Sequence, residues 1–513
     1  MLKKTLPAAI ALAAGLGLAG AANAVNVNHD GTGQVLIYDW YTVEDGIDTL
    51  ISITNTTSEA VALKVRFVEA MNSQEVLDFN LYLSPYDMWT GNVAATADGA
   101  ELSTSDNSCT VPAINGPIPF RNFQYVGSDY SNSEGGPQGL DRTRTGYLEI
   151  IEMGVLLNES VNPAAPAAGE FNPAYYATHA AGVPADCASL VAGWGAGGAW
   201  TAMNGRAVDA PAGGQYGLAA HVDVANGTAT AVDTVALDNF FFSLATEADP
   251  LSSDTDLHRA PGSVNPSLAD ATAIAVLPNG ATVAPASGFG IDAVSIVLMM
   301  EALMNDYVTV ASILSSTDWI ITFPTKRFYV NGWTADANGN PDNVTNVPGN
   351  NPEPFTSFWT DAAVGGVEGS SCETIGISYW DREEGVEAPN PLDFSPQPPG
   401  PSGFALCYEA NILSINGSDI AGGGYTRSNL DLSSGFDAGW MRLSFTGAFL
   451  NANGDTYTRA IALAGGGSVL GLPTVGHSKT EFLNSGAGGA GVLANYQYES
   501  KHKAQVTVIT SGN

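Results

Sequence analysis

The stretch "DTLISITNTTSEAVALKVRFVEA", from Asp48 to Ala70, alternates between two kinds of side chain over two successive runs. In the second run the apolar residues fall on one side of an extended chain: Val61, Leu63, Val65 and Phe67. Lys64 and Arg66 fall on the opposite side, and "NTTSEA" between the runs is turn-like. A period of two indicates half-buried strands. A third such run, "EVLDFNLYL", follows closely, so the sequence predicts an antiparallel meander.

The same pattern continues along the chain. "AAHVDVANGTATAVDTVALDNFFF" places Asn226-Gly227 between extended runs, which favours a hairpin. We therefore predict an all-β, mainly antiparallel protein with an immunoglobulin-like β-sandwich body, as one or two sandwiches with long Gly/Pro/Ala-rich loops. Only "GIDAVSIVLMMEALMNDYVT" suits a helix, and its β-branched start leaves a strand followed by a helix equally open.

Long irregular segments separate the strand runs. Residues 162–200 are rich in Ala, Gly and Pro, and prolines in residues 384–403 exclude regular pairing. The predicted organisation is a leader at 1–24, an N-terminal β-sandwich with a disulfide-tethered loop at 25–210, and a C-terminal β-rich region with a Pro-rich disulfide loop at 211–513. A single large two-sheet body is the alternative, and a duplication relating the halves stays open.

The first residues, "MLKKTLPAAIALAAGLGLAGAANA", have the layout of a secretory signal peptide. Two lysines precede a short apolar run, and Ala22-Asn23-Ala24 supplies small residues for cleavage before Val25. The run is too short and too rich in Ala and Gly to favour a membrane helix, and the mature chain is expected to have no transmembrane span. We expect export to the cell surface or the medium, with the periplasm as an alternative.

The charge balance is strongly acidic. The chain has 18 Lys and Arg against 52 Asp and Glu, and the leader contributes two of the lysines and no acid. Removing the leader leaves 16 basic against 52 acidic residues, a formal charge of −36. Nucleic acid is excluded as a partner class because nothing neutralises phosphate. Divalent cations or basic partners suit this charge better.

Four cysteines are present: Cys109, Cys187, Cys372 and Cys407. An even number in an exported chain favours two disulfides over free buried thiols. Of three pairings, Cys109–Cys187 with Cys372–Cys407 is the simplest, because each then closes a loop within one half.

Catalytic and metal motifs are weak. The six histidines have no ligand spacing, and each is interpreted as an isolated surface or core residue: His29, His179, His221, His258, His477 and His502. No nucleophile elbow or phosphate-binding loop occurs. We therefore predict a protein that is not an enzyme and has no cofactor, apart from calcium.

Calcium is suggested by "DANGNPD", which places oxygen-bearing side chains at every second position: Asp336, Asn338, Asn340 and Asp342. The spacing lacks the glycine and the final glutamate of an EF-hand loop. An ordinary Asn-Gly hairpin with polar flanks is the preferred interpretation.

Two stretches are candidate partner contacts. In "CETIGISYWDREEGVE", Tyr379, Trp380 and Arg382 are typical interface anchors. We interpret the neighbouring carboxylates as part of a solvated turn with local ion pairing, and a glycosidase is the alternative. In "FPTKRFYV", Lys326 and Arg327 either balance charge at a strand end or dock an acidic patch on another copy.

Several stretches resemble a family of exported proteins of Gram-negative bacteria, of similar length, that are described only as cell-surface or hypothetical proteins: "DTVALDNFFF", "RAPGSVNPSLAD", "TDWIITFPTKRFYV", "FSPQPPGPSGFALCYEANIL" and "GVLANYQYESKHK". The resemblance spans nearly the whole mature chain and implies export and a surface setting. It implies no catalytic residues. The expected role is structural or interactive, as a surface-layer or filament subunit that self-associates or binds another surface component. The alternatives are a secreted carbohydrate-active hydrolase and a carbohydrate-binding module that uses Trp194, Trp200 or Trp333.

Signal-peptide processing gives the first testable expectation. Intact-mass analysis of the exported protein should give a chain that begins at Val25, because the small residues at 22–24 suit the processing enzyme. A mature mass that retains residues 1–24 would contradict the predicted leader.

Overall fold

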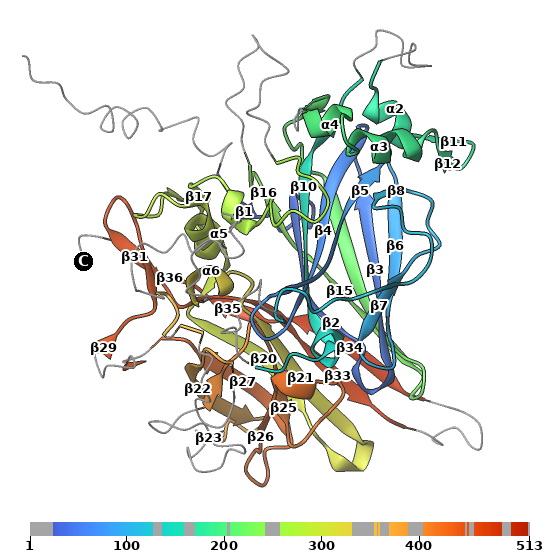
Figure 1. Ribbon diagram of the computed structural model, residues 1–513. Helices are drawn as coiled ribbons and strands as arrows, with labels where there is room; N and C mark the ends of the chain where they lie inside the picture. The colour runs from blue at the N-terminus through green and yellow to red at the C-terminus, as the bar shows by residue number, and fades with distance from the viewer. Residues whose placement is uncertain are drawn as a thin grey trace, which may run out of the picture.

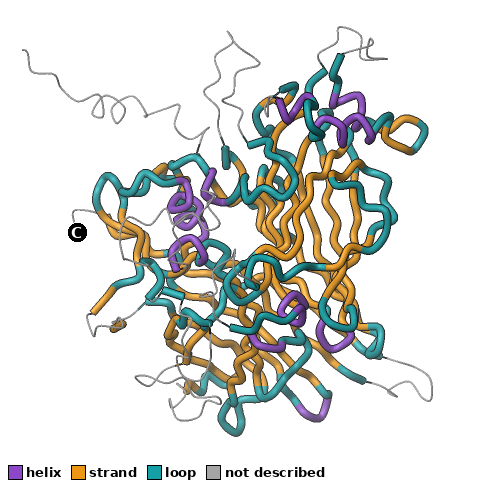
Figure 2. Tube along the Cα trace, viewed as in Figure 1, coloured by secondary structure: helices purple, strands orange, loops and turns teal. Residues whose placement is uncertain are grey.

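The computed structural model describes residues 24–126, 136–158, 170–202, 206–241, 257–330, 353–356, 358–359, 369–387, 404–446, 449–450, 456–484 and 494–510. Strands dominate, and the helices are short (Figure 2). Nearly all neighbouring strands are antiparallel, which confirms the predicted all-β class. No described helix is long and apolar enough to cross a membrane.

The N-terminal half is a pair of facing sheets (Figure 1). The larger sheet has eight strands: β1 (Asn26–Val27), β16 (Val235–Asp238), β2 (Val35–Thr42), β10 (Thr145–Leu156), β4 (Val61–Glu69), β5 (Glu75–Leu83), β8 (Cys109–Val111) and β13 (Val208–Asp209), which pairs with β10. The smaller sheet has six: β15 (Thr228–Asp233), β14 (Gln215–Asp223), β3 (Ile47–Asn55), β6 (Met88–Ala95), β7 (Ala100–Ser103) and β9 (Ile118–Pro119).

The alternation in the opening stretch builds the core between these two sheets. Leu63, Val65 and Phe67 of β4 point into it, as the pattern predicts, and Ile51 and Ile53 of β3 face them. The hairpin at Asn226-Gly227 also forms, since β14 and β15 are antiparallel neighbours in the same sheet.

The C-terminal half contains two further large sheets. One has β23 (Val386–Glu387), β22 (Glu373–Asp381), β27 (Ala438–Ser444), β20 (Ala302–Val308) and β35 (Lys503–Gln505), with β24 (Phe404–Leu406) paired to β22. The other has β26 (Arg427–Leu430), β25 (Ala410–Ile415), β21 (Ser315–Thr322), β33 (Val475–Phe482) and β34 (Tyr496–Lys501). Leu303 and Leu443 of the first sheet share a hydrophobic core with Trp319 and Leu413 of the second.

Smaller elements surround these sheets. Near one end of the N-terminal strands lie α2 (Pro173–Ala177), α3 (Cys187–Gly193) and α4 (Ala199–Ala202) (Figure 1). The other α-helices in the described residues are α5 (Gly290–Leu298) and α6 (Arg327–Val330). Two-stranded pairs are β11 (His179–Ala180) with β12 (Val183–Pro184), β17 (Ala275–Val276) with β18 (Thr282–Val283), β19 (Met299–Met300) with β32 (Leu472–Pro473), and β28 (Phe449–Leu450) with β29 (Thr456–Tyr457). A three-stranded sheet contains β30 (Ala460–Ala462), β31 (Gly467–Leu470) and β36 (Thr507–Thr510).

The two expected disulfides are both present. Cys109 of β8 bonds to Cys187 at the start of α3, and Cys372 bonds to Cys407. The first ties the helical segment to the larger N-terminal sheet. The ambiguous stretch after residue 289 begins as a helix, α5, and then becomes extended at Met299, the reverse of a strand followed by a helix.

The predicted domain boundary at residue 210 is wrong. Strands β14, β15 and β16, which follow that residue, complete the two N-terminal sheets. β14 pairs along its whole length with β3, more than a hundred residues earlier in the chain. The N-terminal sandwich therefore extends to Asp238, because long-range strand pairing, not loop composition, decides membership of a sheet.

The larger N-terminal sheet is buried on both faces, not half-buried as its alternation predicts. Every residue of β2, β4 and β10 is buried. On the face of this sheet that is turned away from the N-terminal core, Trp40, Val68 and Tyr147 form a hydrophobic cluster with Ile320 of β21 and Ile412 of β25. The second C-terminal sheet therefore packs against the face that the sequence assigned to solvent.

The charged residues on that covered face of the larger sheet are consequently paired inside the protein. Lys64 Nζ lies 2.6 Å from Asp78 Oδ2, and Arg66 Nε lies 2.8 Å from Glu75 Oε2. Arg66 also donates to the carbonyl oxygen of Val264 at 2.7 Å. Burial lowers the pKa of Lys64, and Asp78 opposes that shift. Each cation brings its own counter-charge or carbonyl, as burial requires.

A further buried pair on that face gives a stability prediction. Arg327 Nη2 lies 2.8 Å from Oε2 of Glu149, whose side chain is fully buried. Arg327→Met leaves this carboxylate without its closest cation, and we expect the free energy of unfolding to fall by about 3 kcal/mol. Urea unfolding of the disulfide-bonded chain measures the change.

The matched control is Arg382→Met. Arg382 is 66% exposed and lies 3.9 Å from Asp437, which is also exposed. Water and salt screen such a pair, so the expected loss is below about 1 kcal/mol. Equal losses in the two variants would contradict the role given to the buried pair.

Candidate functional site

The predicted contact stretch from Tyr379 to Glu384 forms the end of β22 and the turn after it. Tyr379 is buried, and its hydroxyl donates to Ser433 Oγ at 3.1 Å. Asp381 Oδ1 accepts from the backbone N–H of Glu383 and Gly385, which closes the turn. Tyr379 is therefore unavailable as a surface contact, because its position in the strand alternation points it inward.

Trp380 does reach a surface groove. It lies opposite Trp440 of β27, and their rings stack with centroids 4.0 Å apart and planes 7° apart. Trp440 is 37% exposed. The groove has a volume of about 640 Å³, and Asp306, Arg382 and Tyr498 also line it. Indole faces beside charged groups can hold the apolar face of a ligand ring and hydrogen-bond its polar edge.

The basic pair Lys326–Arg327 lies inside the protein, which corrects the predicted docking role. Lys326 is 1% exposed, and its Nζ donates to the carbonyl oxygen of Ser371. Burial lowers the pKa of Lys326 to about 8, against the opposing effect of Glu373. Both basic residues neutralise internal carboxylates, so they cannot meet an acidic patch on another copy of the folded chain.

Of the remaining predicted site residues, two lie in or near the interior and the others lie in parts of the chain that the structure does not describe. Trp200 is fully buried, and Trp194 is half-buried and donates from Nε1 to Tyr82 Oη at 2.9 Å. The proposed calcium ligands Asp336, Asn338, Asn340 and Asp342, together with Trp333, lie outside the described residues.

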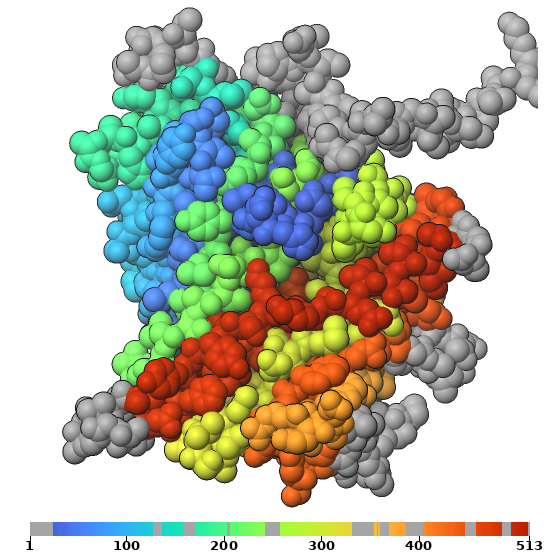
Figure 3. Space-filling model, turned by 180° about the vertical axis from the view of Figure 1, so that it is seen from behind, coloured from blue at the N-terminus to red at the C-terminus, as the bar shows by residue number. Residues whose placement is uncertain are grey.

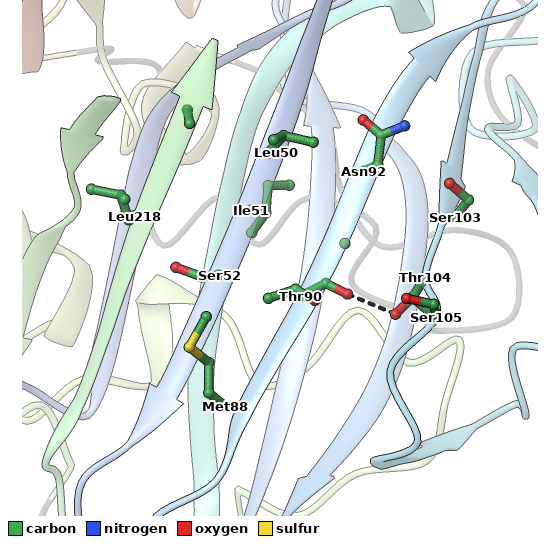
Figure 4. A pocket seen from close by; sticks show the side chains of 12 residues that line it. Leu50, Ile51, Ser52, Met88, Thr90, Asn92, Ser103, Thr104, Ser105 and Leu218 are labelled. Atoms are coloured by element: carbon green, nitrogen blue, oxygen red, sulfur yellow. Dashed lines mark hydrogen bonds between the residues drawn. The ribbon is translucent and has the colours of Figure 1, made fainter. Parts of the chain in front are cut away.

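The outer face of the smaller N-terminal sheet is a second open surface, here called the outer face. It is formed by the outward side chains of β3, β6 and β14: Leu50, Ser52, Thr54, Met88, Thr90, Asn92, Tyr216, Leu218, Ala220 and Val222. None of these side chains is charged. Figure 4 shows Leu50, Met88 and Leu218 beside Ser52 and Thr90 on adjacent strands. A shallow trough of about 590 Å³ runs between them.

The charges near the outer face lie at its margins. Asp48 stands at the start of β3, Asp233 at the end of β15, and Glu101 on the short strand β7. Leu50, Met88 and Tyr216 are large and exposed. A patch of this kind on a strongly acidic chain is typical of a contact surface.

A third feature is a buried cluster of four side chains from four strands, here called the histidine–carboxylate cluster: Asp39 of β2, His221 of β14, His477 of β33 and Glu499 of β34. His477 Nδ1 is 2.8 Å from Asp39 Oδ2, and His221 Nδ1 is 2.9 Å from Glu499 Oε1. His477 Nε2 is 3.8 Å from the same oxygen of Glu499. The two imidazole rings stack with centroids 6.0 Å apart.

The imidazoles and carboxylates of the cluster stabilise each other's charged forms. Burial raises the pKa of Glu499, but His221 and His477 outweigh it and hold the pKa at about 2. Burial lowers the pKa of His477, but Asp39 and Glu499 raise it by a larger amount, so the pKa of His477 lies above its ordinary value. The cluster can therefore hold either protons or another cation between its carboxylates.

Sequence reasoning missed this cluster because its members are distant in the chain. Asp39 and His477 are 438 residues apart, and His221 and Glu499 are 278 apart. The one local signal was the position of His221 in its strand, on the same side as the buried Ala219. An inward-pointing histidine needs a partner, but its own strand does not show which one.

Comparisons with protein-family models, curated proteins and solved structures found no match to this chain.

Proposed function

We propose that this chain is a non-enzymatic, exported β-rich protein of the cell surface, and that copies of it associate through the outer face. The observation that carries the proposal is the uncharged centre of that face. Leu50 lies directly across from Ala220 and Asn92 in the two neighbouring strands, and Ser52 lies across from Leu218 and Thr90.

The distribution of charge over the chain supports a second copy of it as the partner that binds the outer face. The full chain has a formal charge of −34, so most approaches between two copies are repulsive. Contact through the centre of the outer face instead brings together side chains that carry no charge. Removing exposed apolar side chains from water then favours association.

Self-association is tested by placing a charge in the centre of the outer face. We expect light scattering after size exclusion to show a mass that rises with protein concentration for the natural chain, with and without millimolar Ca²⁺. Ser52→Glu should remain monomeric, because each contact then buries two like charges.

Ser58→Glu is the control, since Ser58 is exposed in the turn before β4. It adds the same charge outside the outer face, and it should associate like the natural chain. A natural chain that stays monomeric at every concentration contradicts the proposal, and so does equal loss of association in both variants.

Carbohydrate binding is the second candidate function, and the stacked pair of half-buried Trp380 and exposed Trp440 favours it. In affinity electrophoresis through soluble polysaccharides, the natural chain should be retarded by one of them. Trp440→Ala should weaken that binding about tenfold or more, because it removes the exposed ring of the groove, a change of about 1.4 kcal/mol. Tyr86→Ala removes an exposed aromatic ring elsewhere and should have no effect. No retardation by any polysaccharide, or equal loss in both variants, would contradict this function.

A further inference from the structure

The histidine–carboxylate cluster lies where the two halves of the chain meet. β2 and β14 belong to the N-terminal sheets, and β33 and β34 belong to the second C-terminal sheet. Figure 3 shows the C-terminal segment as a red band beside the green strands of the N-terminal half. Lys501 Nζ of β34 also donates to the carbonyl oxygen of Thr234, at 2.8 Å. Anything bound in the cluster would therefore contact both halves.

The cluster contains three polar atoms that lack any hydrogen-bond partner: His221 Nε2, His477 Nε2 and Glu499 Oε2. The three side chains are at most 2% exposed. Leaving one buried polar atom unpaired costs about 1–3 kcal/mol. Of the three, His477 Nε2 is directed at Glu499, 3.8 Å from its Oε1, and a ligand bound between these two atoms would satisfy it.

The spacing of the donor atoms fits a small cation. One donor atom from each of His221, His477 and Glu499 can be chosen so that all three lie within 4.8 Å of one another. A tetrahedral zinc ion with bonds of about 2.0–2.1 Å holds its donor atoms roughly 3.3 Å apart. The 2.9 Å from Glu499 Oε1 to His221 Nδ1 and the 3.8 Å to His477 Nε2 lie on either side of that value. Each of these two distances is within about half an ångström of it, and the two imidazole nitrogens, at most 4.8 Å apart, have to approach each other by up to about 1.5 Å.

Asp39 has the position of an outer-sphere partner. By accepting the proton of His477 Nδ1, it leaves the Nε2 lone pair of that ring directed towards Glu499. A carboxylate behind a ligating histidine orients the ring and raises its basicity. Two neutral imidazoles and two carboxylates together carry a charge of −2, and Lys479 and Lys501, which interact with Glu499 and Asp39, offset part of it.

The donor types decide the class of ion. Calcium and magnesium prefer sites made entirely of oxygen, whereas two imidazoles and one carboxylate suit a first-row transition metal such as zinc. Lys479, the cross-strand neighbour of Glu499, lies close to the cluster, and Glu499 supplies part of its counter-charge together with Glu481, Asp318 and Asp223.

We propose that His221, His477 and Glu499 bind one divalent transition-metal ion of the zinc class, that Asp39 positions His477, and that the ion fastens β14 to β33 and β34. The ion takes the place of the His221–Glu499 hydrogen bond. The site is independent of the outer face and of its proposed function.

Metal content is the first test. The full disulfide-bonded chain is stripped with a chelator, equilibrated with ZnCl₂, desalted and analysed by elemental mass spectrometry. We expect one zinc per chain in the natural protein and in His29→Gln, which changes an exposed histidine outside the cluster. His221→Gln and His477→Gln should bind zinc at least 100-fold more weakly, and Asp39→Asn about 10- to 100-fold more weakly.

Stability supplies a second readout that does not depend on the variants. Free Zn²⁺ at 100 times its dissociation constant should shift the folding equilibrium of the natural chain about 100-fold towards the native state. A natural chain that retains no zinc and gains no stability overturns the proposal. Equal zinc binding by folded His221→Gln or His477→Gln overturns it too, and either result leaves the cluster as a hydrogen-bonded charge network.

Discussion

The larger N-terminal sheet is covered on both faces, and the arrangement of the rest of the chain follows from that constraint. An antiparallel sheet commonly keeps one face in water, where charged side chains stay hydrated and need no partner. Here the second C-terminal sheet, a loop near residue 263 and α6 cover that face. Every charge on it then needs a partner inside the protein, and several partners come from far along the chain. Arg327, which neutralises Glu149 of β10, lies 178 residues away from it.

This requirement joins the two halves by directed bonds as well as by apolar contact. Thr322 Oγ1 of β21 donates to the carbonyl oxygen of Asp39 at 2.7 Å, and Thr228 Oγ1 of β15 donates to Glu481 of β33. Apolar contact alone tolerates small sliding of one sheet over another, whereas such bonds hold only at one register. The polar junction therefore fixes how the halves sit together, and the histidine–carboxylate cluster lies within it.

The sequence was sufficient for the class of fold and for the disulfides, because strand alternation and a small even number of cysteines are local signals. It was insufficient wherever a distant segment decides the outcome. Alternation shows that Lys64 lies opposite Leu63, but not that Ala260 and its neighbours will cover Lys64. Loop composition likewise placed a boundary at residue 210, whereas the pairing of β14 with β3 moves it to Asp238.

The candidate sites show the same division. Trp380 and Arg382 were recognised from residue type and do line a groove, while Tyr379 of the same stretch points inward. The outer face needed three strands to be placed side by side before its lack of charge became visible. The histidine–carboxylate cluster needed four strands from both halves, so no single window of sequence contained enough of it to be recognised.

The first described residues are built into the fold. Ala24 and Val25 are fully buried, and the Val25 backbone N–H donates to the carbonyl oxygen of Ile274 at 2.9 Å. Val276 returns a bond to the carbonyl oxygen of Val25, also at 2.9 Å. In the folded chain a protease cannot reach the peptide bond between residues 24 and 25. If the predicted leader is removed at that bond, the cut has to come before residues 274–276 pack over Val25.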